Sequence, residues 1–253
     1  MKLILLLLTI LIIILMITPV RETFLTSPRD IKPVCVYVCY NIDKLDYEFI
    51  NKYKDDIKFY VVNSVDDKTK NNEWANKIKQ INNIEYIERE NKGWDTTAWK
   101  ETILNKYDEL SKYDLVILAN NSNVYSFDLK KICTHAIDYD MYGIKDATET
   151  YWHHLQSYFI IIHRHLFTSD DFKKYWINMK QINKRFEAIA YHELRFKPHF
   201  AKLGYKIGVY DITKRNPYFK IEPDFKSKYY PETIKKKSAN EIYYENLKKN
   251  YDY

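Results

Sequence analysis

The architecture of this chain follows from the stretch Ile84-Glu-Tyr-Ile-Glu-Arg-Glu-Asn91-Lys-Gly93-Trp-Asp95 and its continuation Tyr113-Asp-Leu-Val-Ile-Leu-Ala-Asn120-Asn121-Ser122. Each part has the pattern of a strand that ends in a polar turn, and a segment of helical character lies between them. Ligands of open α/β sheets bind just beyond the carboxyl ends of the strands. The two turns therefore predict a site for a polar ligand at that edge.

The composition is that of a folded domain with a mild excess of positive charge. The 253 residues are 46% hydrophobic, which fits one sizeable α/β domain. The net charge of +6 favours anionic partners such as a nucleotide diphosphate, a nucleic acid or a membrane surface, without choosing among them. The basic, Tyr-rich residues 216–253 contain no recognisable nucleic-acid-binding module, so no nucleic acid is expected as a partner.

The three cysteines do not predict a disulfide framework. Cys35 and Cys39 occupy one predicted strand, four positions apart and on the same face, so their Cα atoms lie roughly 13 Å apart. That separation is too large for a disulfide, and Cys133 is remote in sequence. We expect three buried thiols.

The amino terminus carries an apolar run from Leu3 to Ile17, interrupted only by Thr9. This length is near the lower limit of about 17 residues for a transmembrane helix. A cleaved signal peptide is the alternative, but residues 20–23 offer no small-residue cleavage site. We predict an uncleaved single-pass membrane anchor over residues 1–20 and a linker over 21–33. The charges flanking the run lean towards a cytosolic domain, and a lumenal domain stays open.

The rest of the chain alternates between strand-like and helix-like segments. Strands are expected over residues 34–40, 57–62, 84–87, 115–119, 139–144, 160–162 and 205–211. Helices are expected over residues 43–54, 68–81, 99–110, 127–137, 169–179 and 186–203, the last broken or kinked at Pro198. Ser169 is the expected N-cap of the helix over 169–179. This alternation predicts an α/β fold with a mostly parallel sheet flanked by helices over residues 34–215, followed by a basic extension over 216–253.

The first polar turn, Asn91-x-Gly93-x-Asp95, admits two interpretations. It could simply start a helix, with Asp95 as N-cap and Gly93 in a strained turn. It could also bind a ligand, because a glycine lets the backbone approach an anion and the two polar side chains can bond a base or a ribose.

The second polar turn holds three neutral side chains: Asn120, Asn121 and Ser122. It could be an ordinary turn, and it also has the pattern of an N-glycosylation acceptor. A site for a divalent metal and a diphosphate is the functional interpretation. Hard cations prefer charged oxygen ligands, so the absence of a carboxylate here weakens the metal hypothesis.

Two further groups of residues could carry chemistry. His153 and His154 are adjacent on a predicted strand and point to opposite faces, so they are not expected to share an ion. His154, Gln156 and Ser157 could line a sugar-binding site or could form a polar strand entry. Glu193, or His192 before it, could be a general base, with a solvated helix face as the alternative.

Taken together and in order, these motifs resemble the rhamnan synthesis protein F family. The resemblance spans about Val34 to Asp211. Its most specific parts are the Asn-x-Gly-x-Asp pattern and the run His154-Leu-Gln-Ser-Tyr-Phe159. The other matching parts are Tyr113 to Ser122, Tyr142-Gly-Ile144, Phe172 to Trp176, Glu193 and Gly204-Tyr205.

The resemblance implies a membrane-anchored glycosyltransferase with a GT-A-like fold that acts in polysaccharide synthesis. It implies a nucleotide-sugar donor, such as dTDP-rhamnose, and a glycan or polysaccharide acceptor. A non-catalytic relative that binds glycans or nucleotides is the alternative function, because Asn121 stands where the family has an aspartate. That departure leaves dependence on Mn²⁺ or Mg²⁺, and activity itself, open.

The family match also implies roles for individual residues. The expected substrate-binding residues are Asn91, Gly93, Asn120, Asn121 and Ser122 on the donor side, and His154, Gln156 and Ser157 on the acceptor side. Glu193 and Asp95 are the expected catalytic residues, with Glu193 as the base.

Overall fold

The computed structural model describes residues 30–66, 72–125, 127–147, 154–211 and 233–235. The chain divides into two compact units, Met1–Asp30 and Ile31–Tyr253, and every described helix and strand belongs to the second. The predicted anchor over residues 1–20 lies outside the described residues and stays a prediction. Within the described ranges, no helix is both long and apolar enough to cross a membrane.

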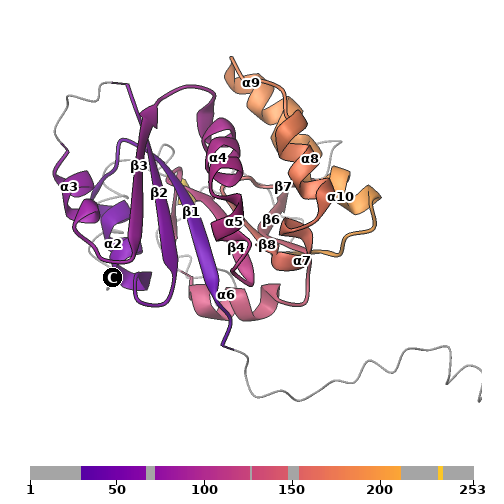
Figure 1. Ribbon diagram of the computed structural model, residues 1–253, viewed down its shortest axis with the longest axis horizontal. Coiled ribbons are helices and arrows are strands. Elements are labelled where there is room, and N and C mark those ends of the chain that lie inside the picture. The colour runs from indigo at the N-terminus through magenta and orange to yellow at the C-terminus, as the bar shows by residue number, and fades with distance from the viewer. Residues whose placement is uncertain (1–29, 67–71, 126, 148–153, 212–232, 236–253) are drawn as a thin grey trace, which may run out of the picture. The chain divides into compact units, whose positions relative to one another are not determined.

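The second unit is built on one mixed sheet, in which the strand order is β3-β2-β1-β4-β8-β6-β7, with β9 beside β6 (Figure 1). Its strands are β1 Pro33–Tyr40, β2 Lys58–Val65, β3 Ile84–Glu90, β4 Leu115–Asn120, β6 Met141–Ala147, β7 His154–Leu155, β8 Phe159–His163 and β9 Ile207–Asp211. A separate pair joins β5 Asn123–Tyr125 to β10 Thr233–Lys235 in antiparallel register.

Most strands of this sheet are parallel, as predicted: β3, β2, β1, β4, β6 and β9 run in one direction, and β8 and β7 run against them. Strands β3, β2, β1 and β4 are parallel. Strand β8 runs antiparallel to both β4 and β6, and β7 is antiparallel to β6. The apolar run Ile160–Ile162 indicates burial on both faces, but a run of this kind does not encode strand direction. The sheet is therefore mixed.

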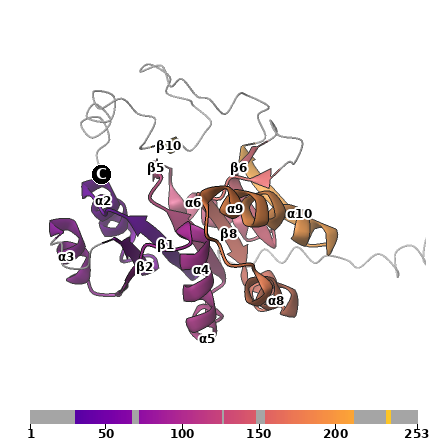
Figure 2. The same cartoon turned by 90° about the horizontal axis from the view of Figure 1, so that it is seen from above.

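Helices cover both faces of the sheet (Figure 2). On one face lie α2 Lys44–Tyr53, α3 Glu73–Lys79 and α6 Leu129–Ala136. On the other lie α4 Trp94–Asn105, α5 Tyr107–Leu110, α7 Arg164–Phe167, α8 Asp170–Asn178 and α10 Leu194–Lys202, the last preceded by α9 Arg185–Ala188 and the π-helical turn η1 Ile189–Glu193.

Strand β1 shows why both faces need cover. Cys35, Tyr37 and Cys39 pack on the side of α2, while the intervening valines pack on the side of α4. All three cysteines are buried, as predicted, and burial raises the pKa of the Cys133 thiol to about 12.

Helix α4 does not begin as predicted. Gly93, with φ of 73°, is its N-cap, and Asp95 lies in its first turn rather than at the cap. Trp94 also has a positive φ, of 55°. Because two successive left-handed residues turn the chain sharply, the helix starts early, and the predicted helix over 99–110 becomes α4 and α5. The N-cap predicted at Ser169 is confirmed, because its side chain accepts a hydrogen bond from Phe172 N in the first turn of α8.

Two other boundaries differ from the prediction. Strand β2 continues to Val65, so Asn63 and Ser64 lie inside it and not after it. The predicted helix over 186–203 is interrupted at the π-helical turn Ile189–Glu193, whereas Pro198 lies within α10. Proline has no N–H for the carbonyl four residues earlier, so the irregular turn precedes Pro198 and is not centred on it.

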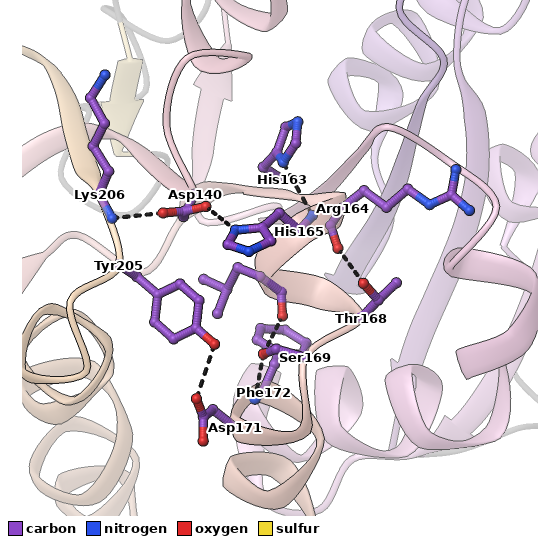
Figure 3. Close-up of polar contacts among 11 residues, drawn as sticks. Asp140, His163, Arg164, His165, Thr168, Ser169, Asp171, Phe172, Tyr205 and Lys206 are labelled. Carbon is purple, nitrogen blue, oxygen red and sulfur yellow. Dashed lines mark hydrogen bonds and ion pairs between the residues drawn. The ribbon is translucent and has the colours of Figure 1, made fainter. Parts of the chain in front are cut away.

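A network of polar contacts lies at the end of the sheet opposite to the one that carries the two polar turns (Figure 3). The Asp140 carboxylate accepts a hydrogen bond from Lys206 N at 2.7 Å and lies 2.7 Å from His165 Nδ1. The Tyr205 hydroxyl donates to Asp171 Oδ2 at 3.0 Å. Since β8 is antiparallel to β4, this network lies at the edge where β4 begins. Its members bond one another, which indicates a structural role in holding β9 to α7 and α8.

Candidate functional site

The two polar turns meet through one hydrogen bond. Asn120, the last residue of β4, donates from Nδ2 to Asp95 Oδ2 in the first turn of α4 at 2.7 Å. Only 5% of Asn120 is exposed. Strands β1 and β2 separate β3 from β4 in the sheet, so this bond reaches across the edge from the β3–α4 turn to β4. Both motifs lie at the carboxyl ends of their strands, as expected, and this bond joins them.

Asn120 organises the second turn. Its Oδ1 accepts hydrogen bonds from Ser122 N at 3.1 Å and from Ser122 Oγ at 2.6 Å. Its backbone N–H donates to Tyr158 O at 3.1 Å, and its backbone oxygen accepts from the Tyr125 hydroxyl at 2.6 Å. Tyr158 belongs to the run His154–Phe159, so the end of that run lies beside the second turn.

Asn121 turns away from this group and holds the end of β1. Its Oδ1 accepts from Tyr40 N at 3.1 Å, and its Nδ2 donates to Tyr40 O at 3.0 Å. The same Nδ2 lies 3.1 Å from Oδ2 of Asp46, which is 1% exposed. The oxygen and the nitrogen of the Asn121 amide are therefore both hydrogen-bonded. An ionised carboxylate at this position would have no N–H to donate to the Tyr40 carbonyl or to Asp46.

Asn91 reaches a residue that the sequence reasoning missed. Its Nδ2 donates to Asp66 Oδ1 at 2.9 Å, and the Tyr40 hydroxyl donates to Asp66 Oδ2 at 2.6 Å. The bond from Tyr40, followed by that from Asn91, lowers the pKa of the Asp66 carboxyl. The hydrogen bond between Tyr40 and Asp66 also raises the pKa of the Tyr40 phenol. Asp66 directly follows β2, and a longer β2 in the prediction would have identified it.

Gly93 is required by space as well as by conformation. A Cβ built on it would overlap the Thr97 Oγ1 and would lie 2.6 Å from Thr97 Cβ. The first turn of α4 therefore folds closely over Gly93, which fixes Asp95 two residues later. This confirms the strained turn predicted at Gly93.

The donor set at the second turn does not fit a divalent metal. Asn121 is committed to Tyr40 and Asp46, and Asn120 Oδ1 is committed to Ser122. Among the residues that the structure describes, no three His, Cys, Asp or Glu side chains are grouped so that they could hold a metal ion.

The residues that the family resemblance assigns to the acceptor side lie in a second group. His154 Nε2 lies 3.6 Å from Glu193 Oε1, and the two side chains are 6% and 21% exposed. The sequence gap between them is 39 positions, so the fold creates this pair. Gln156 and Ser157 follow His154 and are half-buried, and the Gln156 N–H donates to Lys145 O at 2.9 Å. His153 lies outside the described residues.

His192 is not available as a base. It is 1% exposed, and its Nδ1 lies 2.9 Å from the Tyr175 hydroxyl among aromatic side chains. Burial lowers its pKa to about 3, so it is neutral near pH 7. Of the two candidate bases, His192 and Glu193, it is Glu193 that is partly exposed and lies beside His154.

The match to one family model agrees with the sequence motifs. The family model described as rhamnan synthesis protein F matches residues 59–244. No protein in a search of curated sequences matches the chain. A solved structure of HddC from Yersinia pseudotuberculosis complexed with GMP-PN is 15% identical, with 87% of this chain and 99% of that chain covered and a TM-score of 0.47.

A second solved structure is the glycosyltransferase GlyE of Streptococcus pneumoniae TIGR4. It is 11% identical, with 71% of this chain and 45% of that chain covered and a TM-score of 0.38. The family assignment rests on the family model, which spans more than half of the 253 residues. The chain belongs to the rhamnan synthesis protein F family.

Proposed function

We propose that this chain is a glycosyltransferase that moves a sugar, with rhamnose the first candidate, from a nucleotide-sugar donor to a glycan or polysaccharide acceptor. The observation that carries the proposal is the bond between Asn120 and Asp95, which joins two family motifs at the carboxyl edge of the sheet. Membership of the rhamnan synthesis protein F family supports the reaction class. The anchor over residues 1–20, and the side of the membrane that the domain faces, remain part of the proposal.

The donor would bind across the ends of β1 to β4. Tyr40 is 39% exposed, although its hydroxyl is bonded to Asp66 and both its backbone polar groups are bonded to Asn121. A fixed, solvent-facing ring offers a stacking surface for a nucleobase. The polar side chains of Asn91 and Asp95 lie on the neighbouring turn, where they could bond ribose or sugar hydroxyls.

Glu193 would deprotonate the acceptor hydroxyl as it attacks the anomeric carbon of the donor sugar. The proton passes to the carboxylate, and the bond from that carbon to the nucleotide diphosphate breaks. His154, at 3.6 Å, would orient the carboxylate. Cationic side chains and backbone N–H groups would stabilise the departing diphosphate, because the second turn offers no metal ligands.

The test is a thermal-shift and transfer assay on the full chain. The panel contains nucleotide sugars and free nucleotide diphosphates, each with and without Mn²⁺ or Mg²⁺. A stabilising ligand raises the melting temperature by mass action. Binding of one nucleotide sugar, with transfer that Asp95→Asn and Glu193→Gln abolish, is the expected result. Binding without transfer to any glycan acceptor would favour the non-catalytic alternative, and no binding across the panel would reject the donor site.

A further inference from the structure

A row of four charged or titratable side chains links α10 to the edge of the sheet. Glu193 and Lys197 are four positions apart at the start of α10, a spacing that puts them on one side of a helix. Glu193 faces His154 at 3.6 Å, and Lys197 Nζ lies 2.5 Å from Asp146 Oδ2. The Lys197 and Asp146 side chains are only 20% and 18% exposed.

The two partners of α10 come from paired strands. Asp146 of β6 is opposite Leu155 of β7, and Ala147 is opposite His154. The backbone bond from Gln156 to Lys145 extends this pairing. Helix α10 is therefore attached to one pair of strands at two points, one helical turn apart.

Glu193 lies at the junction between the π-helical turn and α10. Glu193 is the last residue of the π-helical turn and makes no side-chain cap for α10. Its neighbour His192 is anchored in the aromatic core through Tyr175. A small rotation or slide of α10 on β6 would carry the Glu193 carboxylate away from His154, and the Lys197–Asp146 contact opposes that movement.

A sheltered ion pair is a weak source of stability, because desolvation offsets much of the attraction between the charges. One oxygen of the pair, Asp146 Oδ1, is buried and has no hydrogen-bond partner among the described residues. The pair therefore leaves one buried hydrogen-bond acceptor unsatisfied. Fixing the register of α10 accounts for its position better than stabilising the fold does.

We propose that the Lys197–Asp146 ion pair is a positioning device that sets the register of α10 and so holds the Glu193 carboxylate against His154. The inference deepens the proposed function and rests on it for the reaction. Lys197 and Asp146 are positioning residues, since they act through Glu193.

The test compares Lys197→Met and Asp146→Asn with the reversed pair Lys197→Asp with Asp146→Lys, all in the full chain. Misplacement by about 1 Å can slow a reaction roughly a hundredfold, so kcat should fall tenfold to a hundredfold in the single variants while donor binding by thermal shift stays unchanged. The reversed pair should recover part of the loss. Lys174→Met is the matched control, because Lys174 is 68% exposed and lies 3.8 Å from Asp170 on α8.

A measurement that does not depend on turnover separates the positioning proposal from the proposed function. The ¹⁵N resonances of the His154 ring, followed against pH, report its contact with Glu193. Lys197→Met should shift this titration and Lys174→Met should not. An unchanged His154 titration in Lys197→Met overturns the positioning proposal whatever the activity. A shifted titration in a protein that transfers no sugar supports positioning and rejects the proposed function.

Discussion

Asn120 Nδ2 donates to Asp95 Oδ2 at 2.7 Å, and this bond joins the end of β4 to the first turn of α4. Asn120 uses its other amide atom, Oδ1, for Ser122. The amide is thus satisfied on both sides, and its orientation fixes which atoms of the turn face the ligand. Removing either partner should have separate structural and functional consequences.

Asp95→Ala and Asp95→Asn distinguish these consequences. The alanine leaves Asn120 Nδ2, in a residue that is 5% exposed, without its acceptor, which should cost about 1–3 kcal/mol of unfolding free energy. The asparagine can still accept the bond through its Oδ1, so its stability should stay near wild type while donor binding or turnover falls. Chemical denaturation and the transfer assay check both. Equal activity of Asp95→Asn and wild type would remove Asp95 from the site.

Tyr40→Ala should weaken nucleotide binding, because the 39% exposed ring is the stacking surface that the proposal assigns to the base. A loss of about tenfold or more in affinity is expected from base–aromatic stacking. Tyr40→Phe keeps the ring and removes only the hydroxyl bonded to Asp66, so it should retain most of the affinity. Calorimetric titration with the free nucleotide diphosphate measures both variants. The proposal fails at this point if Tyr40→Ala binds as wild type does.

Asn121→Asp restores the residue type that the family resemblance implies at this position. The new carboxylate would replace an N–H donor that lies 3.0 Å from Tyr40 O and 3.1 Å from Asp46 Oδ2. Repulsion from Asp46 raises the pKa of the introduced carboxyl in the folded state. The stability deficit should therefore grow as pH rises above about 4, where the unfolded chain ionises this group.

Melting curves of Asn121→Asp and wild type between pH 4 and pH 8 test this expectation, with Asn121→Ala as the control that removes the amide without adding charge. A deficit that Mn²⁺ or Mg²⁺ relieves in Asn121→Asp alone would mean that one substitution creates an ion site from Asp46 and the new carboxylate. A variant as stable as wild type at pH 8 would contradict the contacts that Asn121 makes with Tyr40 and Asp46.

Gly93→Ala should destabilise the protein through two effects. The residue has φ of 73°, which costs an alanine about 1–2 kcal/mol, and the new Cβ would overlap the Thr97 side chain. Gly204→Ala is the matched control, since Gly204 has φ of 89° but no atom within 4 Å of its Cβ position. Denaturant titration should give a larger loss for Gly93→Ala than for Gly204→Ala. Equal losses would show that the Thr97 contact yields easily.

The sequence predicted the parts of this fold that local patterns control. The buried run at β4, the cap at Ser169 and the polar edge around Asn120 all follow from residue type and spacing. The direction of β8 does not, because a strand buried on both faces has the same pattern in either direction. Nor does the start of α4, because a left-handed tryptophan after Gly93 has no ordinary signal.

The sequence predicted which motifs lie at the carboxyl edge of the sheet, but not the residues that bond them. Asp46 and Asp66 belong to a helix start and a strand end that looked ordinary in sequence, and long-range contacts with Asn121 and Asn91 give them their place. The pairing of His154 with Glu193 likewise depends on how α10 packs on β7, which no local pattern encodes. Contacts of this kind follow from tertiary packing and become visible only in the fold.

His192 should make the protein less stable in acid. Its pKa in the folded state is about 3, well below the value of about 6.5 in an unfolded chain. Between these two values the unfolded state binds one more proton than the folded state, so the stability that the neutral ring contributes is complete above pH 6.5 and is lost as pH falls. The expected slope is about 1.4 kcal/mol per pH unit over this range.

His192→Phe tests this slope, because phenylalanine fits among the rings of Trp176 and Phe196, whose centroids lie 5.0 Å and 4.7 Å from that of His192. The variant should lose the His192 contribution to the change of stability with pH. It should also be less stable by an amount that does not depend on pH, because the Tyr175 hydroxyl loses its partner, His192 Nδ1. Tyr175→Phe is the control that keeps the titrating ring, and its slope should match wild type. Urea denaturation at several pH values between 4 and 7 measures all three proteins. If His192→Phe retains the full wild-type slope, protons taken up on unfolding go to other groups and His192 is not buried as described.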